Sequence, residues 1–271
     1  MPELPEVETT VNGIKPWLEN KKIAHINIYN PSLRWMIPAD LATKYPSQTI
    51  SSISRRAKYI LIHFDSQSTI IIHLGMSGSL VILNQDTPLK KHDHFEMIMQ
   101  DGTILRFNDP RRFGCVLDTQ DFLQHKLIRN LGPEPLDTDF NGKLLKTRAK
   151  NRTLAVKNFI MDGKVVVGVG NIYASEALFM AKIYPATSAG RISLAKYQIL
   201  AEKIKQVLSK AITAGGTTLN DFINADGKPG YFSQQLLVYG RKGQACFNCS
   251  APIEQMTIGQ RSSFYCASCQ K

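Results

Sequence analysis

No stretch of the sequence is long and apolar enough to cross a membrane. A membrane-spanning helix needs about 18 consecutive apolar residues, and no run of that kind occurs among the 271 residues. The first 20 residues carry four glutamates, whereas a secretory signal has a basic start and an apolar core. We therefore expect a soluble protein that is neither secreted nor held in a membrane.

Cysteines and acidic residues are also few. Of five cysteines, Cys115 is isolated and the other four lie near the C-terminus, which fits metal binding in a reducing compartment better than a disulfide scaffold. Only 22 acidic residues oppose 33 lysines and arginines, so the formal net charge is +11. This charge predicts a polyanionic partner. Nucleic acid is the first candidate, and an acidic membrane surface is the second.

The sequence has no internal repeat, and 43% of it is hydrophobic, which is enough to fill the cores of two domains. In the first half, short β-type runs recur, such as 58–64 and 69–74, and Asp101-Gly102 is a hairpin turn signal. These runs predict a β-sandwich or a flattened barrel. Turn residues place the expected domain boundary close to Pro133.

The second half is predicted to be helical before it returns to strands at about Gln235. Ser193 is expected to cap a helix whose apolar residues, starting with Leu194, keep a 3.6-residue period until Gly215-Gly216 stops it. A shorter helix is expected over 172–181. The two halves together predict an α+β protein of two domains.

The first residues are suited to covalent catalysis. Removal of Met1 would leave Pro2 as a secondary α-amine beside the carboxylate of Glu3. The pKa of an α-amino group is about 7.7–8.0, so near neutral pH part of it is unprotonated and able to form a Schiff base with an aldehyde-like sugar carbon. The plainer interpretation is a helix that starts at Pro5 and carries an apolar stripe as far as Leu18. That helix needs neither Pro2 nor Glu3.

Four cysteines near the C-terminus form two CxxC pairs separated by 16 residues: Cys246 and Cys249, then Cys266 and Cys269. Such pairs bring four thiolates into the tetrahedral geometry that zinc accepts, and four protein ligands leave no open position, so the predicted zinc is structural. Two disulfides or a redox pair are the alternatives. Thr257–Arg261 is expected to form a hairpin tip with Gly259 in the turn. There Arg261 is either a phosphate clamp or a solvated surface arginine.

Other motifs are less specific. Gly168–Tyr173 is expected to open a helix whose first amides bind an anion, with Asn171 capping the helix or donating to phosphate; a simple glycine turn is the alternative. Upstream lies a basic run, which forms either a solvated face or a DNA track: Lys146, Arg148, Lys150, Arg152 and Lys157.

Two further segments carry charge beside aromatic residues. Arg56 and Lys58 are expected on one face of a strand, where Lys58 contacts phosphate, supplies a proton or is an ordinary strand-edge charge. Arg111, Arg112 and Phe113 form a loop suited to wedging into a base stack, although Phe113 could equally belong to the core. The motif His92–His94 lacks a third ligand nearby and is not expected to bind metal.

Taken in order, eight blocks of the sequence resemble the bacterial formamidopyrimidine-DNA glycosylase family. The resemblance runs from terminus to terminus, and the combination is highly specific. The blocks are Pro2–Thr9, Arg55–Tyr59, His73–Gly78, Lys91–His94, Asp109–Gly114, Gly168–Tyr173, Asp226–Phe232 and the CxxC tail.

The resemblance implies an N-terminal β-sandwich with a leading helix and a C-terminal domain with a helix–two-turns–helix motif and a zinc-finger hairpin, with DNA bound between them. The expected ranges are 1–132 for the catalytic β-sandwich domain, 133–150 for a linker, 151–234 for the helix–two-turns–helix domain and 235–271 for the zinc finger. The zinc finger would hold one structural Zn²⁺.

The implied activity is that of a bifunctional DNA glycosylase and abasic-site lyase of base-excision repair. Such an enzyme removes oxidised purines, chiefly 8-oxoguanine opposite cytosine and formamidopyrimidines, and then cleaves the strand by β,δ-elimination. By position, Pro2 would attack C1′ of the lesion nucleotide and hold the sugar as a Schiff base, with Glu3 as general acid and base. Lys58 would bind phosphate and assist β-elimination, and Arg261 would assist δ-elimination.

The resemblance also implies how DNA is bound. Met76, Arg111 and Phe113 match residues that fill the void left by the flipped nucleotide, with Arg111 facing the orphan cytosine. A base inside a duplex is inaccessible, which explains why an enzyme that extrudes it needs such residues. Further DNA-contact positions are His92, Arg152 and Asn171, and the segment 217–231 matches a mobile loop that closes over the flipped base.

We therefore expect a monomer that binds damaged double-stranded DNA, has no membrane partner and works in the bacterial cytoplasm at the nucleoid. Two other functions stay open. One is an endonuclease VIII-type glycosylase for oxidised pyrimidines, against which Leu4 and the set Met76, Arg111 and Phe113 argue. The other is a non-catalytic zinc-finger DNA-binding protein, which borohydride trapping would distinguish because it forms no Schiff base.

Overall fold

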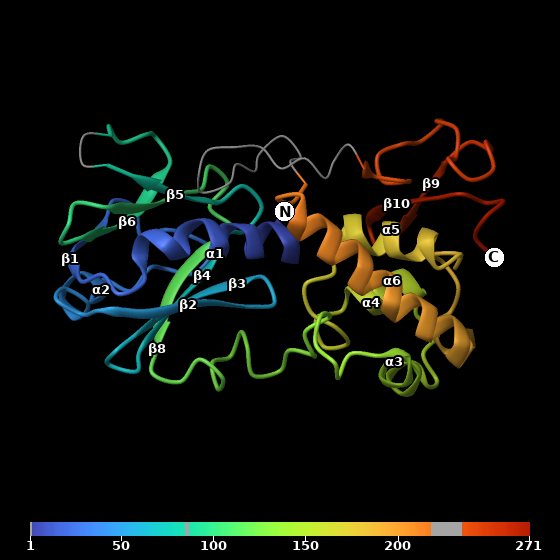
Figure 1. Cartoon of the computed structure of the whole chain (residues 1–271), viewed down its shortest axis with the longest axis horizontal. Coiled ribbons are helices and arrows are strands. Elements are labelled where there is room, and N and C mark those ends of the chain that lie inside the picture. The colour runs from blue at the N-terminus through green and yellow to red at the C-terminus, as the bar shows by residue number, and fades with distance from the viewer. Residues whose placement is uncertain (1, 85–86, 218–234) are drawn as a thin grey trace. The chain divides into compact units, whose positions relative to one another are not determined.

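The computed structural model describes residues 2–84, 87–217 and 235–271 (Figure 1). By its internal contacts the chain divides into two compact units. The first is built from the chain up to Arg129 and the segment that begins at Ala214, and the second from Asn130–Thr213 and the C-terminal residues. The sequence block 226–232 and nearly all of the predicted loop 217–231 lie outside the described residues. None of the helices in the described ranges could span a membrane.

The first unit is a β-sandwich of two four-stranded antiparallel sheets. One sheet has the order β1 (Ile23–Ile28), β6 (Asp93–Met99), β7 (Ile104–Asn108) and β5 (Ser79–Leu83). The other has the order β2 (Ile50–Arg56), β3 (Tyr59–Phe64), β4 (Thr69–His73) and β8 (Cys115–Thr119). Because each sheet keeps its own strands, the sandwich is correct and the flattened barrel is wrong.

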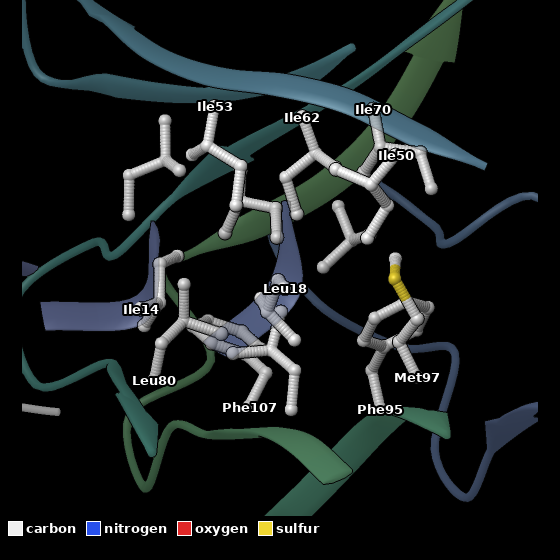
Figure 2. Close-up of a cluster of buried hydrophobic side chains, with 14 of the residues drawn as sticks. Ile14, Leu18, Ile50, Ile53, Ile62, Ile70, Leu80, Phe95, Met97 and Phe107 are labelled. Atoms are coloured by element: carbon white, nitrogen blue, oxygen red, sulfur yellow. The ribbon is translucent and has the colours of Figure 1, made fainter. Parts of the chain in front are cut away.

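The core of this unit lies between the two sheets, and helix α1 (Leu4–Leu18) supplies part of it. Figure 2 shows Ile14 and Leu18 of α1 between Ile53 and Ile62 of one sheet and Phe107 of the other. Each fully buried side chain of this size contributes about 1.5–3 kcal/mol to folding. Helix α1 is therefore anchored from Val7 to Leu18 by the same core that joins the sheets. The short helix α2 (Leu41–Lys44) follows β1.

The Asp101-Gly102 turn is confirmed. Gly102 has a positive φ of 88°, and the Met99 amide donates to the Thr103 carbonyl over 2.8 Å, which closes the hairpin between β6 and β7. This pairing matters for the site, because β6 begins and β7 ends beside the segments that carry the candidate DNA contacts.

The second unit is mainly helical. Its helices are α3 (Gly142–Ala149), α4 (Val156–Met161), α5 (Asn171–Met180), the 3₁₀ turn η1 (Ala189–Arg191) and α6 (Leu194–Thr213), and they are followed by the hairpin of β9 (Glu254–Ile258) and β10 (Arg261–Tyr265). Helix α3 lies in the range 133–150 that the sequence marks as a linker. It begins at a capping Asn141, whose side chain accepts from the Leu144 amide, and packs against α6.

The two predicted helices are confirmed as α5 and α6. Ser193 caps α6, since its hydroxyl accepts from the Lys196 amide over 3.2 Å, and the helix ends just before Gly215-Gly216, which both have positive φ. Leu194 does not belong to the buried stripe, because the residue is 40% exposed. The stripe begins one turn later, at Tyr197.

Candidate active site and nucleic-acid interface

The N-terminal residues are held in place by a buried carboxylate. Pro2 and Glu3 are buried, and Glu3 is the N-cap of α1 in a capping box with Glu6. One oxygen of the Glu6 carboxylate accepts from the Glu3 amide and the other from the Thr217 amide, both over 2.8 Å. The sequence interpretation that the helix does not need Glu3 is therefore wrong, because it missed the cap one residue before Leu4.

Arg55 connects helix α1 to the turn that contains Lys58. The guanidinium of Arg55 pairs with Glu8 of α1 over 2.5 Å and donates to the Ala57 carbonyl over 2.8 Å. Arg56 pairs across the hairpin with Tyr59, so Ala57 and Lys58 form the two-residue turn between β2 and β3. The expectation that Arg56 and Lys58 share one strand face is wrong. Ala57 takes a positive φ of 55°, and no glycine or asparagine in the sequence marks the turn.

His73, the last residue of β4, lies next to Lys58. It opens the sequence block His73–Gly78, but the sequence predicted no role for it. Burial, together with the positive charges of Lys58 and Arg34, lowers the pKa of His73 to about 4. The ring is thus neutral at physiological pH, and its Nδ1 accepts from the Gly75 amide over 3.0 Å. Because it is neutral, the ring adds no positive charge next to Lys58.

Asp109 joins the two loops that carry the candidate void-filling residues. Its carboxylate is fully buried and accepts from the Ser77 hydroxyl over 2.7 Å, the Gly114 amide over 2.8 Å and the Arg111 amide over 3.3 Å. Three donors satisfy a carboxylate that would otherwise be costly to bury. The loop after β4 and the loop before β8 are therefore fixed to each other.

Gly75 lets these loops approach closely. Its φ is +65°, and a Cβ at this position would lie 2.4 Å from the Gly114 nitrogen. On the outside of the joined loops, Met76, Arg111 and Phe113 are all exposed, and the Arg111 guanidinium lies 5.2 Å from the centre of the Phe113 ring. The structure thus brings these two loops together, and Phe113 is not a core residue.

His92 belongs to the same surface. It is half-buried, and its carbonyl accepts from the Asp109 amide over 3.0 Å. His94 is buried instead, with Nε2 hydrogen-bonded to the Asp109 carbonyl over 2.8 Å and Nδ1 without a partner. Within the described ranges the only group of three or more His, Cys, Asp or Glu side chains close enough to hold a metal ion is the four cysteines.

In the second unit, Asn171 does not cap its helix. It is the first residue of α5, and Gly170 is the N-cap. The side chain of Asn171 accepts from the Lys157 ammonium over 2.6 Å and donates to the Ser262 carbonyl over 3.0 Å, so it connects α4, α5 and β10. Asn171 is therefore held in one orientation, and its amide group also lies 3.4 Å from the Tyr239 hydroxyl.

The basic run is not one continuous track. Lys157 is fully buried, Lys146 donates to the carbonyls of Gly190 and Ile192, and Arg148 donates to those of Lys164 and Val165. These three cations stabilise the unit. Lys150 and Arg152 are the exposed members, and they remain available to a polyanion.

The predicted hairpin is confirmed. Ile258 pairs with Arg261, which leaves Gly259 and Gln260 as a two-residue turn with φ values of 56° and 60°. A Cβ on Gly259 would lie 2.3 Å from the Asn158 amide nitrogen, so the tip packs against α4 and requires glycine. Arg261, the first residue of β10, is exposed at this tip.

The four CxxC cysteines converge at the base of the hairpin. Their sulfur atoms all lie within 4.8 Å of one another, with Cys249 and Cys266 3.5 Å apart and Cys246 and Cys269 4.0 Å apart. Zn–S bonds of about 2.3 Å in a tetrahedron place sulfurs roughly 3.8 Å apart. The cysteines are therefore close enough to bind a metal ion. They form no disulfides, and Cys115 is buried in β8.

Comparison with known proteins identifies the family. The N-terminal domain of formamidopyrimidine-DNA glycosylase matches residues 1–116, and its H2TH domain, the helix–two-turns–helix domain, matches residues 131–223. The formamidopyrimidine-DNA glycosylase of Marinobacter nauticus is 54% identical over 271 residues, and that of Syntrophotalea carbinolica is 52% identical over 272; each match covers both chains completely.

Solved structures agree with this result. A mutant of the Lactococcus lactis enzyme bound to DNA containing Fapy-dG has a TM-score of 0.92 and 32% identity, and the match covers 100% of each chain. The L. lactis enzyme bound to DNA with an abasic site has a TM-score of 0.91 and 31% identity, covering 99% of each chain. The chain is a DNA glycosylase of base-excision repair. It belongs to the formamidopyrimidine-DNA glycosylase family.

The Asp109 network leads to a first prediction. In Asp109→Asn an NH₂ group replaces one acceptor oxygen and meets a donor, so we expect the free energy of unfolding to fall by about 1–3 kcal/mol. The Gly114 amide should also exchange its hydrogen faster. Ser77→Ala is the matched control, because it removes one donor and leaves the carboxylate intact. Unchanged exchange at Gly114 in Asp109→Asn would show that Asp109 does not hold the loop.

Proposed function

We propose that this chain removes oxidised purines, chiefly 8-oxoguanine opposite cytosine and formamidopyrimidines, from damaged double-stranded DNA and then cleaves the strand by β,δ-elimination. The family membership supports this, as do the related structures with Fapy-dG and abasic-site DNA. The observation that carries the proposal is the buried start of α1, where Glu6 holds the Glu3 amide and Arg55 links α1 to the Lys58 turn.

Pro2 is the proposed nucleophile. With Met1 removed, its nitrogen attacks C1′ of the lesion nucleotide, the bond from C1′ to the base breaks, and the base leaves with a proton. The nitrogen loses its proton, and its lone pair then forms the C1′=N⁺ bond of a Schiff base while the C1′–O4′ bond breaks and O4′ takes up a proton, which opens the sugar ring. Glu3 transfers protons at the sugar as general acid and base, because its carboxylate lies one residue from the reacting amine.

The Schiff base permits strand cleavage, because it acidifies the neighbouring C2′–H. Loss of that proton expels the 3′ phosphate in β-elimination, and a second elimination expels the 5′ phosphate. We assign Lys58 to phosphate binding and β-elimination, and Arg261 to δ-elimination. The exposure of Arg261 at a glycine turn and the charge of Lys58 beside a neutral His73 suit these roles.

DNA is held by residues of both units. Met76, Arg111 and Phe113 fill the void of the flipped nucleotide, and Arg111 faces the orphan cytosine. Their exposure on two joined loops supports this assignment. The remaining DNA contacts are assigned to His92, Arg152 and Asn171.

The four cysteines are proposed to hold one structural Zn²⁺. Four thiolates at these separations suit zinc, and they would fix the hairpin that presents Arg261. We keep the division 1–132, 133–150, 151–234 and 235–271 as the proposed functional domains of a monomer that acts on DNA in the bacterial cytoplasm.

Borohydride trapping tests the proposed chemistry. The protein should give a covalent adduct with a duplex that contains 8-oxoguanine opposite cytosine, because borohydride reduces the Schiff base to a stable amine. Pro2→Gly should bind the duplex and trap less adduct, since glycine is a weaker primary amine. A comparison with an oxidised-pyrimidine duplex distinguishes the endonuclease VIII-type activity. Adduct formation by protein that retains Met1 would exclude Pro2 as the nucleophile.

Metal analysis tests the zinc proposal. The purified protein should contain one zinc per chain, and Cys266→Ser should lose it and bind DNA more weakly, because the hairpin tip with Arg261 becomes disordered. The first unit should keep its stability, which denaturant unfolding checks. Cys115→Ser is the control. Cys115 is not one of the CxxC cysteines, so this variant protein should still contain one zinc per chain. Full DNA affinity after zinc removal would contradict the proposal.

A further inference from the structure

A buried cation, Arg106 of β7, lies beneath the segment that carries His92. Its side chain is 4% exposed, and no sequence motif included it. The guanidinium pairs with two buried carboxylates of β6: Nε lies 2.5 Å from Glu96 and Nη1 lies 3.3 Å from Asp93. These contacts satisfy only part of the guanidinium, which has five N–H donors.

The rest of the guanidinium holds backbone outside the sheet. Nη1 donates to the Pro88 carbonyl over 2.9 Å, and Nη2 donates to the Thr87 carbonyl over 2.8 Å. Asp93 accepts from the Lys90 amide over 2.7 Å. The segment 87–92 is thus bound at three backbone groups by one ion pair, that of Arg106 and Asp93.

The far end of this segment is bound as well. The His92 carbonyl accepts from the Asp109 amide, and Asn108 donates to Asp93 over 2.7 Å. His92 therefore lies between two anchors, one built on Arg106 and the other on the chain at Asp109. Its side chain remains half-buried at the surface.

Burying this cluster of charges has a large free-energy cost. Removing ions from water costs several kcal/mol each, and an apolar group of the same volume often stabilises a core equally well. Unlike an apolar group, the planar guanidinium of Arg106 binds carboxylates and carbonyls at fixed angles. The contribution particular to Arg106 is thus the orientation of 87–92.

We propose that Arg106 is a positioning residue that fixes His92 for contact with a DNA phosphate. The inference rests on the proposed function, in which His92 contacts DNA. Arg106 does not touch DNA itself, since it is buried, and it acts through the backbone of 87–92.

The test is a double-mutant cycle with Arg106→Lys and His92→Ala in the full-length protein. Lysine keeps the charge but cannot bridge both carbonyls and both acids. The dissociation constant is measured for a duplex with an uncleavable abasic-site analogue. Each single variant should weaken binding by roughly 10- to 100-fold, the factor for one hydrogen bond to a charged group. The double variant should bind no more weakly than His92→Ala alone, because the loss occurs through His92.

The matched control is Tyr29→Phe. The Tyr29 hydroxyl donates to Glu96 over 2.5 Å, so its removal disturbs the same ion cluster without touching 87–92. This variant should lower the free energy of unfolding and leave the dissociation constant unchanged. If Arg106→Lys does not fold, Asp93→Asn serves in the same cycle, because it replaces an acceptor oxygen by an NH₂ group and loosens the Lys90 amide.

Two results would overturn the proposal. Equal weakening by Arg106→Lys in the wild-type and His92→Ala backgrounds would mean that Arg106 acts on the whole unit and not through His92. An unchanged dissociation constant in Arg106→Lys would mean that it has no positioning role. If His92→Ala alone has no effect, the DNA contact of His92 is wrong and this proposal with it, while borohydride trapping still reports separately on the glycosylase chemistry.

Discussion

The buried carboxylate of Asp109 is the interaction on which the first unit's functional surface depends. The carboxylate accepts hydrogen bonds from one hydroxyl and two amides of two loops that lie far apart in the sequence. The main chain of Asp109 also forms hydrogen bonds with the His92 carbonyl and the His94 ring. Without the carboxylate, the loop after β4 and the loop before β8 would have to satisfy these donors separately. The exposed positions of Met76, Arg111 and Phe113 follow from this one buried group.

The same device recurs elsewhere in the molecule. Glu6 divides its two oxygens between the amides of Glu3 and Thr217. In the second unit, Glu176 is 1% exposed and accepts from three successive amides, those of 237–239, and burial raises its pKa. Carboxylates of this kind act as fixed acceptors for loop backbone. Glu6 fixes the backbone next to Pro2, and Glu176 fixes the segment that carries Tyr239, whose hydroxyl meets the proposed DNA contact Asn171.

The sequence predicted the regular elements well, because their signals are local. Helices α5 and α6, the Asp101-Gly102 hairpin and the Gly259 turn each follow from periodicity, a cap or a glycine. It failed where long-range pairing decides the conformation. The turn at Ala57 carries no local signal, and its positive φ is imposed by the pairing of Arg56 with Tyr59.

Side-chain roles were harder to predict than elements. Nothing in the basic run distinguishes the buried Lys157 from the exposed Arg152, since that difference arises when Lys157 meets Asn171 across the fold. Arg106 and His73 were likewise hidden, because Arg106 meets Glu96 and Asp93 of β6 and His73 lies beside Lys58, whereas the capping role of Glu3 rests on Glu6 three residues later. The family blocks located the candidate residues, whereas the structure explains what holds them.

In the proposed function, the joined loops present Arg111 to the base opposite the lesion. The most direct measurement is the excision rate of 8-oxoguanine opposite each of the four bases, by the wild-type protein and by Arg111→Ala. A side chain that reads the edge of a base contributes about 1–3 kcal/mol of discrimination. Arg111→Ala should lose most of the preference for cytosine, while the rates opposite the other bases should change less. An equal fall of all four rates would contradict this role of Arg111.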